Sequence, residues 1–234
     1  MARFTIRFLD DAETHLAQRL LYTVYVEQGG WTPVEGNPTD WRIERDAFGE
    51  PCLCDKFDGS ALWLGCFDGD RLVGCHRINC REAGSCFDLE DYLDLPEFLL
   101  TAKTAELTRL AVHPGYQKTH AMLSILAFEY RWLRQHGFKY FFTTSKFPQP
   151  GKMYGRMGML PFEGPAFKFN EEEEDECRLL YSEYGRSQCD GPAARYLKLA
   201  DQIAEREQRV EAKAGDRQAR PVLPVAGAAQ LFIG

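Results

Sequence analysis

The chain begins with alternating apolar and polar side chains, which predict a strand over residues 4–9. Apolar residues then recur at helical spacing, and Asp10 or Asp11 can cap the helix that they predict. The apolar face of that helix consists of Leu16, Leu20, Leu21, Val24 and Tyr25. Gly29-Gly30 ends the helix, and a loop rich in Pro, Gly and Asn follows over residues 31–59. Because structureless connections of this length are usually functional, we expect the loop to contribute to a site.

The rest of the chain alternates between short apolar runs and helical stretches. It predicts strands over 61–67, 71–81, 102–113, 138–144, 160–170 and 177–183. It also predicts helices over 89–100, with a break at Pro96, over 119–136 and over 148–158. Asp68-Gly69-Asp70 predicts a hairpin, and residues 102–144 predict a β-α-β unit with a right-handed crossover. This order predicts an α/β (α+β) fold with a mixed, largely antiparallel twisted sheet and helices on both faces.

The C-terminal part differs in character from the rest. We expect one domain over residues 1–185, followed by a C-terminal helical extension over 186–234. The extension consists of a charged helix over 192–215 and an Ala/Pro/Gly-rich tail over 220–234. It either packs on the domain and frays at its end, or binds a partner.

Composition narrows the class of protein. Of the 234 residues, 44% are hydrophobic, which is enough for a core and excludes global disorder. The formal net charge of −7 argues against broad nucleic-acid binding, and no apolar run approaches the roughly 18 residues of a membrane span. The N-terminus has no signal-peptide pattern, so we expect the eight cysteines to be reduced thiols in the cytoplasm. Cys52-x-Cys54 is spaced too closely for the usual zinc pair, and we expect no bound metal.

A turn between the strand over 102–113 and the helix over 119–136 is a candidate phosphate site. It reads Val112-His113-Pro114-Gly115-Tyr116-Gln117-Lys118. Free backbone N–H groups and the helix dipole favour a phosphate at such a position. Most turns with one glycine bind nothing, and His113 is either a titrating site residue or an ordinary turn residue before Pro114.

Two segments resemble the GNAT acyltransferase superfamily. Ala105-Glu106-Leu107-Thr108-Arg109-Leu110-Ala111-Val112-His113-Pro114 is similar to its fourth strand, and Met153-Tyr154-Gly155-Arg156-Met157-Gly158-Met159-Leu160-Pro161-Phe162 to its later Tyr-x-x-x-Gly segment. The pattern Glu106-x-x-Arg109-x-x-Val112 resembles one branch, the acyl-homoserine-lactone (autoinducer) synthases and long-chain N-acyl amino acid synthases. Three further pieces are similar to this branch: Val24-Tyr25-Val26-Glu27-Gln28-Gly29-Gly30-Trp31, Glu44-Arg45-Asp46-Ala47-Phe48 and Gly74-Cys75-His76-Arg77-Ile78. The resemblance covers residues 4 to about 185.

The sequence departs from the pattern of this branch at several positions. Leu21 stands where the family usually has an Arg, and Gly49 stands where an Asp normally follows the loop Phe. Residues 116–121 lack the glycine pair of the phosphate loop in acetyl-CoA enzymes, which is also typical of the branch that uses acyl carrier protein. These departures leave the identity of the acceptor open.

Forming an amide from a thioester requires a base, stabilisation of the thioester oxygen and departure of a thiolate. Glu106 is the candidate base, directly or through water, and its alternative role is an ion pair with Arg109. Positions i and i+3 of a flat strand face opposite sides, so a β-bulge near Thr108 is needed to bring both side chains to one cleft. Tyr154 lies where the superfamily often places a general acid for the thiolate.

Several further residues are candidates for the substrate site. Arg77 and Arg109 could orient the loop carboxylates Glu44 and Asp46, or hold an acceptor carboxylate with a bidentate fork. Tyr25 and Trp31 would line the acyl or acceptor pocket, or belong to the core. The resemblance adds Val112 and His113 beside the substrate, and Tyr116, Gln117 and Lys118 at the phosphates.

The resemblance implies an N-acyltransferase that moves an acyl group, expected to be fatty, from an acyl carrier protein or CoA thioester to a small amine such as an amino acid. The thioester would be a co-substrate and no cofactor would be bound permanently. A short-chain acetyl-CoA-dependent N-acetyltransferase and a non-catalytic binding module on the same fold are the alternatives. A deep apolar tunnel would favour a fatty donor, and a shallow pocket would favour acetyl. The sequence leaves the oligomeric state open.

Overall fold

The fold is described for most of the predicted domain. The computed structural model describes residues 4–81, 86–146, 151–156, 158–169, 176–184, 198 and 201–202. The charged helix predicted over 192–215 lies outside the described residues except at 198 and 201–202, which are helical, and the tail over 220–234 lies outside them entirely.

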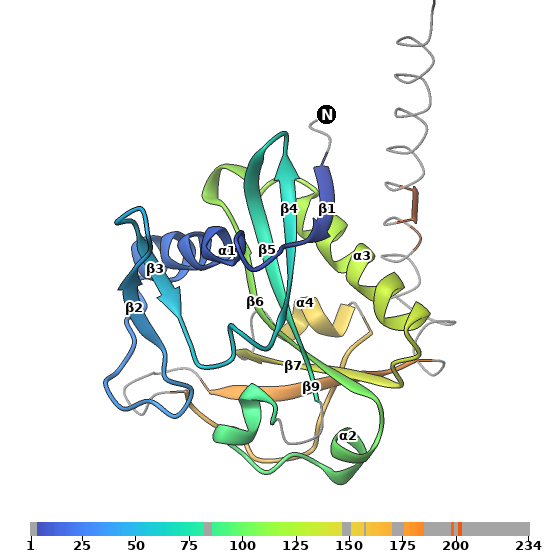
Figure 1. Cartoon of the computed structure of the whole chain (residues 1–234). Coiled ribbons are helices and arrows are strands. Elements are labelled where there is room, and N and C mark those ends of the chain that lie inside the picture. The colour runs from blue at the N-terminus through green and yellow to red at the C-terminus, as the bar shows by residue number, and fades with distance from the viewer. Residues whose placement is uncertain are drawn as a thin grey trace, which may run out of the picture.

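A seven-stranded sheet forms the centre of the molecule. In spatial order its strands are β1 (Phe4–Phe8), β4 (Leu62–Asp68), β5 (Arg71–Cys80), β6 (Thr104–Val112), β7 (Tyr140–Lys146), β9 (Cys177–Glu183) and β8 (Leu160–Pro161). Every neighbouring pair is antiparallel except β6 and β7, which are parallel. The mixed, largely antiparallel sheet predicted from the sequence is therefore confirmed (Figure 1).

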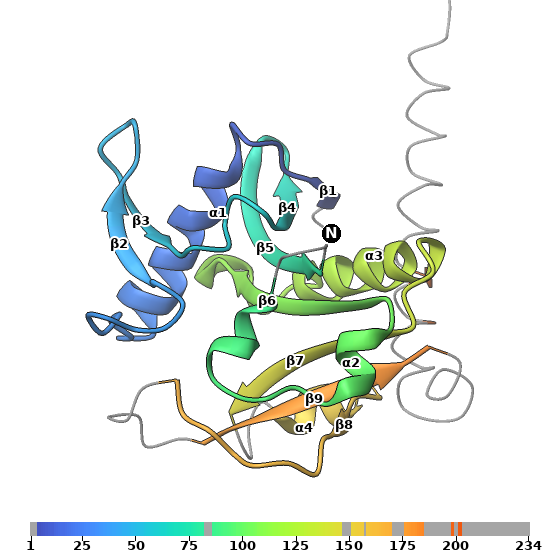
Figure 2. The same ribbon diagram turned by 60° about the horizontal axis from the view of Figure 1, so that its bottom comes forward.

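Helices cover both faces of this sheet, as predicted. They are α1 (Thr14–Leu21), which continues as the π-helix η1 (Tyr22–Gln28), α2 (Glu97–Thr101), α3 (Ala121–Gln135) and α4 (Gly151–Arg156). Two short 3-10 helices, η2 (Asp88–Asp91) and η3 (Pro114–Tyr116), complete the elements other than strands. Figures 1 and 2 show α1 and α3 on opposite sides of β4 and β5.

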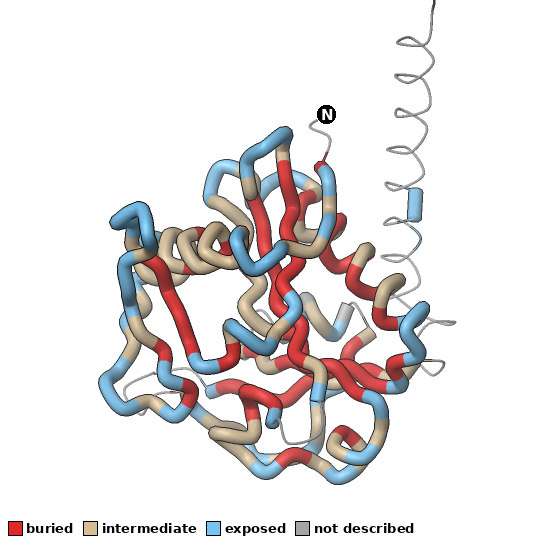
Figure 3. The backbone as a smooth tube through the Cα atoms, in the orientation of Figure 1, coloured by how far each residue is buried: buried red, intermediate tan, exposed pale blue. Residues whose placement is uncertain are grey.

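The core lies where α3 meets the central strands. Figure 3 shows the middles of β4 and β5 and one side of α3 as buried, whereas the hairpin tips are exposed. Leu64, Ile78, Leu107 and Leu133 belong to this cluster. At Gly74 a Cβ atom would lie 2.8 Å from Cδ1 of Ile125, so a larger residue there would require the Ile125 side chain to move.

Two parts of the predicted element order need correction. The loop over 31–59 contains a separate two-stranded sheet of β2 (Arg42–Arg45) and β3 (Pro51–Cys54), visible beyond α1 in Figure 2. Most of β2 is exposed, so its sequence shows no apolar alternation. The strand predicted over 160–170 is reduced to β8 and a single bridge at Phe167, because the prolines in this stretch cannot donate to a ladder. By contrast, the break predicted at Pro96 in the helix over 89–100 is confirmed, because two short helices lie on either side of it.

Candidate active site

A bulge in β6 shapes the centre of the sheet. Along β5 and β6, Arg77 pairs with Thr108 whereas Cys75 pairs with Ala111, so β6 carries one extra residue between these pairs. Arg109 takes up the extra length with a φ of 61°, a left-handed conformation that is uncommon for a residue other than glycine. The bulge expected near Thr108 is therefore present, and it lies at Arg109.

Beside the bulge, β6 and β7 separate. Their parallel pairing is confined to Thr104–Glu106 with Tyr140–Phe142, and beyond these residues the two strands enclose a cavity of about 520 Å³. The cavity is lined by Val24, Tyr25, Gly29, Trp31, Thr32, Val34, Asn37, Trp41, His76, Tyr92, Leu107, Thr108, Arg109, Leu110, Thr143, Thr144, Ser145, Lys146, Tyr154, Phe169 and Cys177. This volume falls within the range of about 300–1,000 Å³ that is typical of ligand pockets.

Aromatic side chains form one wall of the cavity. Tyr25, on η1, donates a hydrogen bond to the carbonyl oxygen of Leu110 at 3.2 Å, and burial raises the pKa of this phenol to about 12. Trp31 packs edge-on against Trp41, with 5.0 Å between ring centroids. Tyr154 of α4 also lines the cavity, and burial raises its pKa, so its hydroxyl keeps its proton at neutral pH. The structure thus brings the predicted site residues Tyr25, Trp31, Arg109 and Tyr154 to one cavity.

Arg77 lies fully buried beneath this cavity and binds three carboxylates. Its Nη1 donates to Asp55 Oδ1 at 2.6 Å and to Asp58 Oδ1 at 2.9 Å. Its Nη2 donates to Asp88 Oδ2 at 2.9 Å, and its Nε donates to the hydroxyl of Thr108 at 3.1 Å. A buried guanidinium needs this many acceptors to offset its loss of hydration. Arg77 therefore fixes the position of the bulge from below.

Arg109 shares two of the same carboxylates. Its Nε and Nη2 donate to Asp55 Oδ2 at 3.1 and 2.7 Å, and its Nη2 lies 2.7 Å from Asp88 Oδ2. Burial by itself would raise the pKa of Asp55, but the charges of Arg109 and Arg77 hold that pKa well below its usual range. At Asp58, burial and the charge of Asp55 raise the pKa instead. The two arginines and three aspartates form one buried ionic network.

The predicted partners of these arginines were wrong. Glu44 binds Arg42 on the exposed strand β2 at 2.5 Å, and Asp46 pairs with Arg19 of α1. Neither carboxylate is among the residues that line the cavity. Sequence reasoning missed the true partners, Asp55, Asp58 and Asp88.

A signal for two of these aspartates was present in the sequence. Residues 44–49 lack the Asp that normally follows the loop Phe, whereas Phe57-Asp58 supplies that pair nine residues further on. Asp55 precedes the pair by two residues, at the start of the turn that follows β3. The short acidic pattern thus occurs twice in this part of the chain, and Asp55 and Asp58 of the second occurrence bind Arg77.

Glu106 sits behind the cavity. Its Oε2 accepts hydrogen bonds from Asn79 Nδ2 and from the backbone N–H of Asp88, both at 2.8 Å, and its Oε1 accepts from the backbone N–H of Leu89 at 2.9 Å. Burial, reinforced by the charge of Asp88, raises its pKa to about 7. The carboxylate is connected to Arg109 through Asp88, and it anchors the turn that carries Asp88.

The residues of the predicted phosphate turn lie beyond the end of the cavity. His113 accepts a hydrogen bond at Nδ1 from the backbone N–H of Gly115, and burial together with Arg71 lowers its pKa. Tyr116 donates to Asp68 at 2.8 Å, and Gln117 donates to Gln28 at 2.9 Å. Lys118 is exposed, and Val112 packs against the core cluster that contains Phe4 and Val73. None of these residues is among those that line the cavity.

The described part of the chain offers few features for metal binding or for a cysteine nucleophile. It contains no group of three or more His, Cys, Asp or Glu side chains placed to hold a metal ion. Burial raises the pKa of the thiols of Cys52 and Cys54, that of Cys54 to about 12, so both stay protonated and poorly nucleophilic. Within the described residues, no helix is long and apolar enough to span a bilayer.

Comparison with known proteins agrees with the geometry of the site. Residues 20–127, which include η1, the ionic network and β6, match the family model of the acetyltransferase (GNAT) domain. No curated protein matches the chain by sequence. Among solved structures, the chain is similar to FeeM, an N-acyl amino acid synthase from uncultured soil microbes, with a TM-score of 0.61 and 17% identity over 84% of this chain and 99% of FeeM.

Two acyl-homoserine-lactone synthases have the same fold. The synthase LasI matches with a TM-score of 0.57 and 16% identity over 80% of this chain and 94% of LasI. BjaI, a CoA-dependent synthase solved with SAM and isopentyl-CoA, matches with a TM-score of 0.57 and 16% identity over 87% of this chain and 90% of BjaI. The chain therefore has the GNAT fold, and its structure resembles those of N-acyl amino acid synthases and acyl-homoserine-lactone synthases.

Proposed function

We propose that the protein transfers an acyl group from the thioester of CoA or of an acyl carrier protein to the amine of a small acceptor. The observation that carries this proposal is the cavity between the diverging strands β6 and β7. Strands that separate expose edges along which an extended arm bearing amide groups can pair, as a peptide does in strand addition. The pantetheine arm of both thioester donors is such a chain.

The size of the cavity favours a donor with more than an acetyl group. A volume of about 520 Å³ exceeds what two carbon atoms need, and aromatic side chains of Tyr25, Trp31 and Trp41 make one wall apolar. Burial of each methylene group of an acyl chain would contribute about 0.8 kcal/mol. We therefore favour a fatty acyl donor and treat acetyl-CoA as the alternative.

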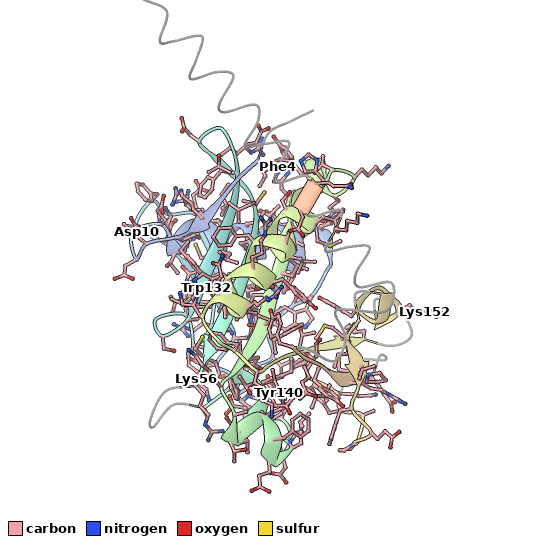
Figure 4. All side chains as sticks on the ribbon, turned by 90° about the vertical axis from the view of Figure 1, so that its right-hand side faces the viewer. Phe4, Asp10, Lys56, Trp132, Tyr140 and Lys152 are labelled. Atoms are coloured by element: carbon pink, nitrogen blue, oxygen red, sulfur yellow. The ribbon has the colours of Figure 1, made fainter. Side chains whose placement is uncertain are left out.

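Basic side chains are available near the cavity for a negatively charged donor. Lys146 lines the cavity, and Lys152 lies on the outer side of the neighbouring helix α4 (Figure 4). Lys118 is exposed just before α3, where Gln117 and Tyr116 also lie. We infer that these lysines meet the phosphate of the pantetheine arm, in CoA or in a carrier protein, because positive charge steers anionic partners.

The charges of the ionic network favour one kind of acceptor. The fork of Arg109 is already bound to Asp55 and Asp88, so it does not stand open for an acceptor carboxylate. Two guanidinium groups face three aspartates, so the floor of the cavity carries no surplus positive charge. Such a floor suits an acceptor that arrives as an ammonium ion. An amino acid or a similar small amine fits this description.

Two predicted catalytic roles belong to this proposal. Tyr154 lines the cavity and can return a proton to the departing thiolate. Glu106 has a pKa near neutrality, which suits a base, but three donors already occupy its oxygens. Its role as the base stays a prediction.

The proposal is tested by product analysis. Purified protein is incubated with acetyl-CoA, dodecanoyl-CoA or a dodecanoyl carrier protein, together with a panel of amino acids and polyamines, and amides are identified by mass spectrometry. We expect an amide from a dodecanoyl thioester, and none from Thr144→Trp, which fills the cavity. An amide from acetyl-CoA alone would favour the short-chain alternative. If no thioester yields an amide, the protein does not have the proposed function.

A further inference from the structure

A buried histidine lies opposite the bulge. His76 is on β5 between Cys75 and Arg77, at the point where β6 has its extra residue, and it is among the residues that line the cavity. It is only 2% exposed. The imidazole is therefore enclosed by protein on all sides except the cavity.

The carboxylate of Glu129 lies against the ring of this histidine. Nδ1 of His76 lies 3.0 Å from Oε1 and 3.1 Å from Oε2 of Glu129, which is on α3 and has no exposure to solvent. Both oxygens of this buried carboxylate thus face the same ring nitrogen. A buried carboxylate needs such a partner to offset its lost hydration.

We propose that His76 accepts the proton of the attacking amine and that Glu129 positions its ring for this task. The inference rests on the proposed acyl transfer and names the residue that serves as its base. An ionised Glu129 requires a hydrogen on Nδ1, so the lone pair of His76 lies on Nε2, at the opposite side of the ring. When Nε2 gains a proton, the negative charge of Glu129 stabilises the imidazolium in a low-dielectric environment.

Glu106 is less suited to this step. Both of its oxygens accept hydrogen bonds, and it does not line the cavity, whereas His76 does. A base must come within hydrogen-bond reach of the proton that it removes. Glu106 instead supports the turn that presents Asp88 to the arginines.

The step balances with His76 as a proton carrier. An acceptor that arrives as an ammonium ion first loses one proton to solvent. The resulting neutral amine attacks the thioester carbon, the N–C bond forms, and one N–H proton passes to Nε2 of His76. The C–S bond then breaks, and its electron pair leaves on the thiolate. The thiolate takes a proton from Tyr154 or solvent, and the imidazolium returns its proton to the same pool, so the products are an amide and a thiol.

The proton arrangement can be measured in the protein without substrate. Nitrogen-15 NMR of labelled histidine, assigned with His76→Asn, is expected to show the Nδ1–H tautomer at neutral pH. Glu129→Gln should shift the signal towards a mixture of tautomers, because a neutral amide no longer selects Nδ1–H. A His76 that is the Nε2–H tautomer, or that stays imidazolium from pH 5 to 9, would overturn the proposal.

Kinetics test the role itself. His76→Asn keeps an N–H donor near the position of Nδ1 but lacks Nε2, so kcat should fall by about 10²–10⁴-fold while the KM of the thioester stays within about twofold. Glu129→Gln should lower kcat by up to about 10⁴-fold, since it weakens stabilisation of the imidazolium and no longer selects the tautomer of the ring. The matched control is His136→Asn, at the exposed C-terminal end of α3, which should behave as wild type.

The outcomes separate this inference from the function on which it rests. A wild-type protein that forms no amide with any thioester would end both. An active wild type together with a folded His76→Asn variant of near-normal kcat would end only the assignment of His76. In that case a simultaneous loss in Glu106→Gln would return the role of base to Glu106.

Discussion

Arg109 lies over the ring of Trp41, with its guanidinium carbon 3.8 Å from the ring centroid. The edge of the same guanidinium donates to Asp55, so an aromatic face fixes its plane and a carboxylate fixes its direction. This pair connects the loop after η1 to the bulge in β6. The loop residue Trp41 thereby holds the strained backbone that opens the sheet.

Arg109→Lys should separate acceptor binding from donor binding. Lysine keeps the charge but lacks the planar fork and stacks poorly, so the bulge should loosen beside the acceptor. We expect the KM of the amine to rise about tenfold while the KM of the thioester changes by less than about twofold, as measured by varying each substrate in turn. Arg134→Lys, at an exposed position of α3, is the control. Equal effects on both substrates would contradict this division.

Asp55→Asn should destabilise the protein strongly. The substitution removes the carboxylate that joins Arg77 to Arg109 and leaves the fully buried Arg77 with less compensation. Removing one partner of a buried ion pair typically costs about 3–5 kcal/mol. Because the folded-state pKa of Asp55 is lowered, the wild-type contribution is present above the unfolded value and is lost as the pH falls through the folded one.

Urea unfolding at pH 7 measures this cost. Asp58→Asn is the comparison, because Asp58 binds the same arginine as Asp55. The pKa of Asp58, however, is raised rather than lowered. Its loss of unfolding free energy should be the smaller of the two. The reverse order would show that Asp55 is not the centre of the network.

Glu106→Gln should change how stability depends on pH. The pKa of Glu106 is raised from 4.5 to about 7 in the folded state, so its favourable contribution is complete below pH 4.5 and disappears as the pH rises through 7. Glutamine does not titrate. The stability of the variant relative to wild type should therefore improve by about 2–3 kcal/mol between pH 5 and pH 8.

Unfolding free energies at unit pH intervals would show this trend. Glu27→Gln, at an exposed position of η1, is the control. If the difference in unfolding free energy between Glu106→Gln and wild type stays constant from pH 5 to pH 8, then Glu106 is ionised throughout this range.

Gly29→Ala should distort the aromatic wall of the cavity. A Cβ atom at Gly29 would lie 2.7 Å from the carbonyl oxygen of Tyr25, which is backbone and cannot move aside cheaply. Shifting that turn would displace Tyr25 and Trp31. We expect a loss of about 1–3 kcal/mol in stability and a higher KM for the acyl donor.

Thermal melting and donor titration would check this result. Gly59→Ala is the matched control, because a Cβ atom there meets nothing within 4 Å. An unaltered KM in a folded Gly29→Ala variant would show that the π-helix does not shape the donor site.

Much of the fold follows from local pattern. The hairpin of β4 and β5, the β-α-β unit and the amphipathic helix α3 are all predicted from periodicity, because each buries one regular stripe of apolar residues. The hairpin of β2 and β3 was missed because β2 is largely exposed and shows no such stripe. Tyr25, Trp31, Arg109 and Tyr154 were also identified from the sequence, through motifs in which neighbouring residues keep a fixed spacing.

The ionic network and the His76–Glu129 pair could be found only in the folded chain. Arg77 binds Asp55 and Asp88 across 22 and 11 positions of sequence, and Glu129 lies 53 positions from His76. In the sequence a carboxylate in a loop, or a glutamate within a helix, has the same appearance whether it faces water or a buried cation. Sequence determines which local elements form, because helix and strand periodicity depend on near neighbours. Tertiary packing decides which charges meet, because the free energy of a buried charge depends on groups that only the fold brings within hydrogen-bond distance.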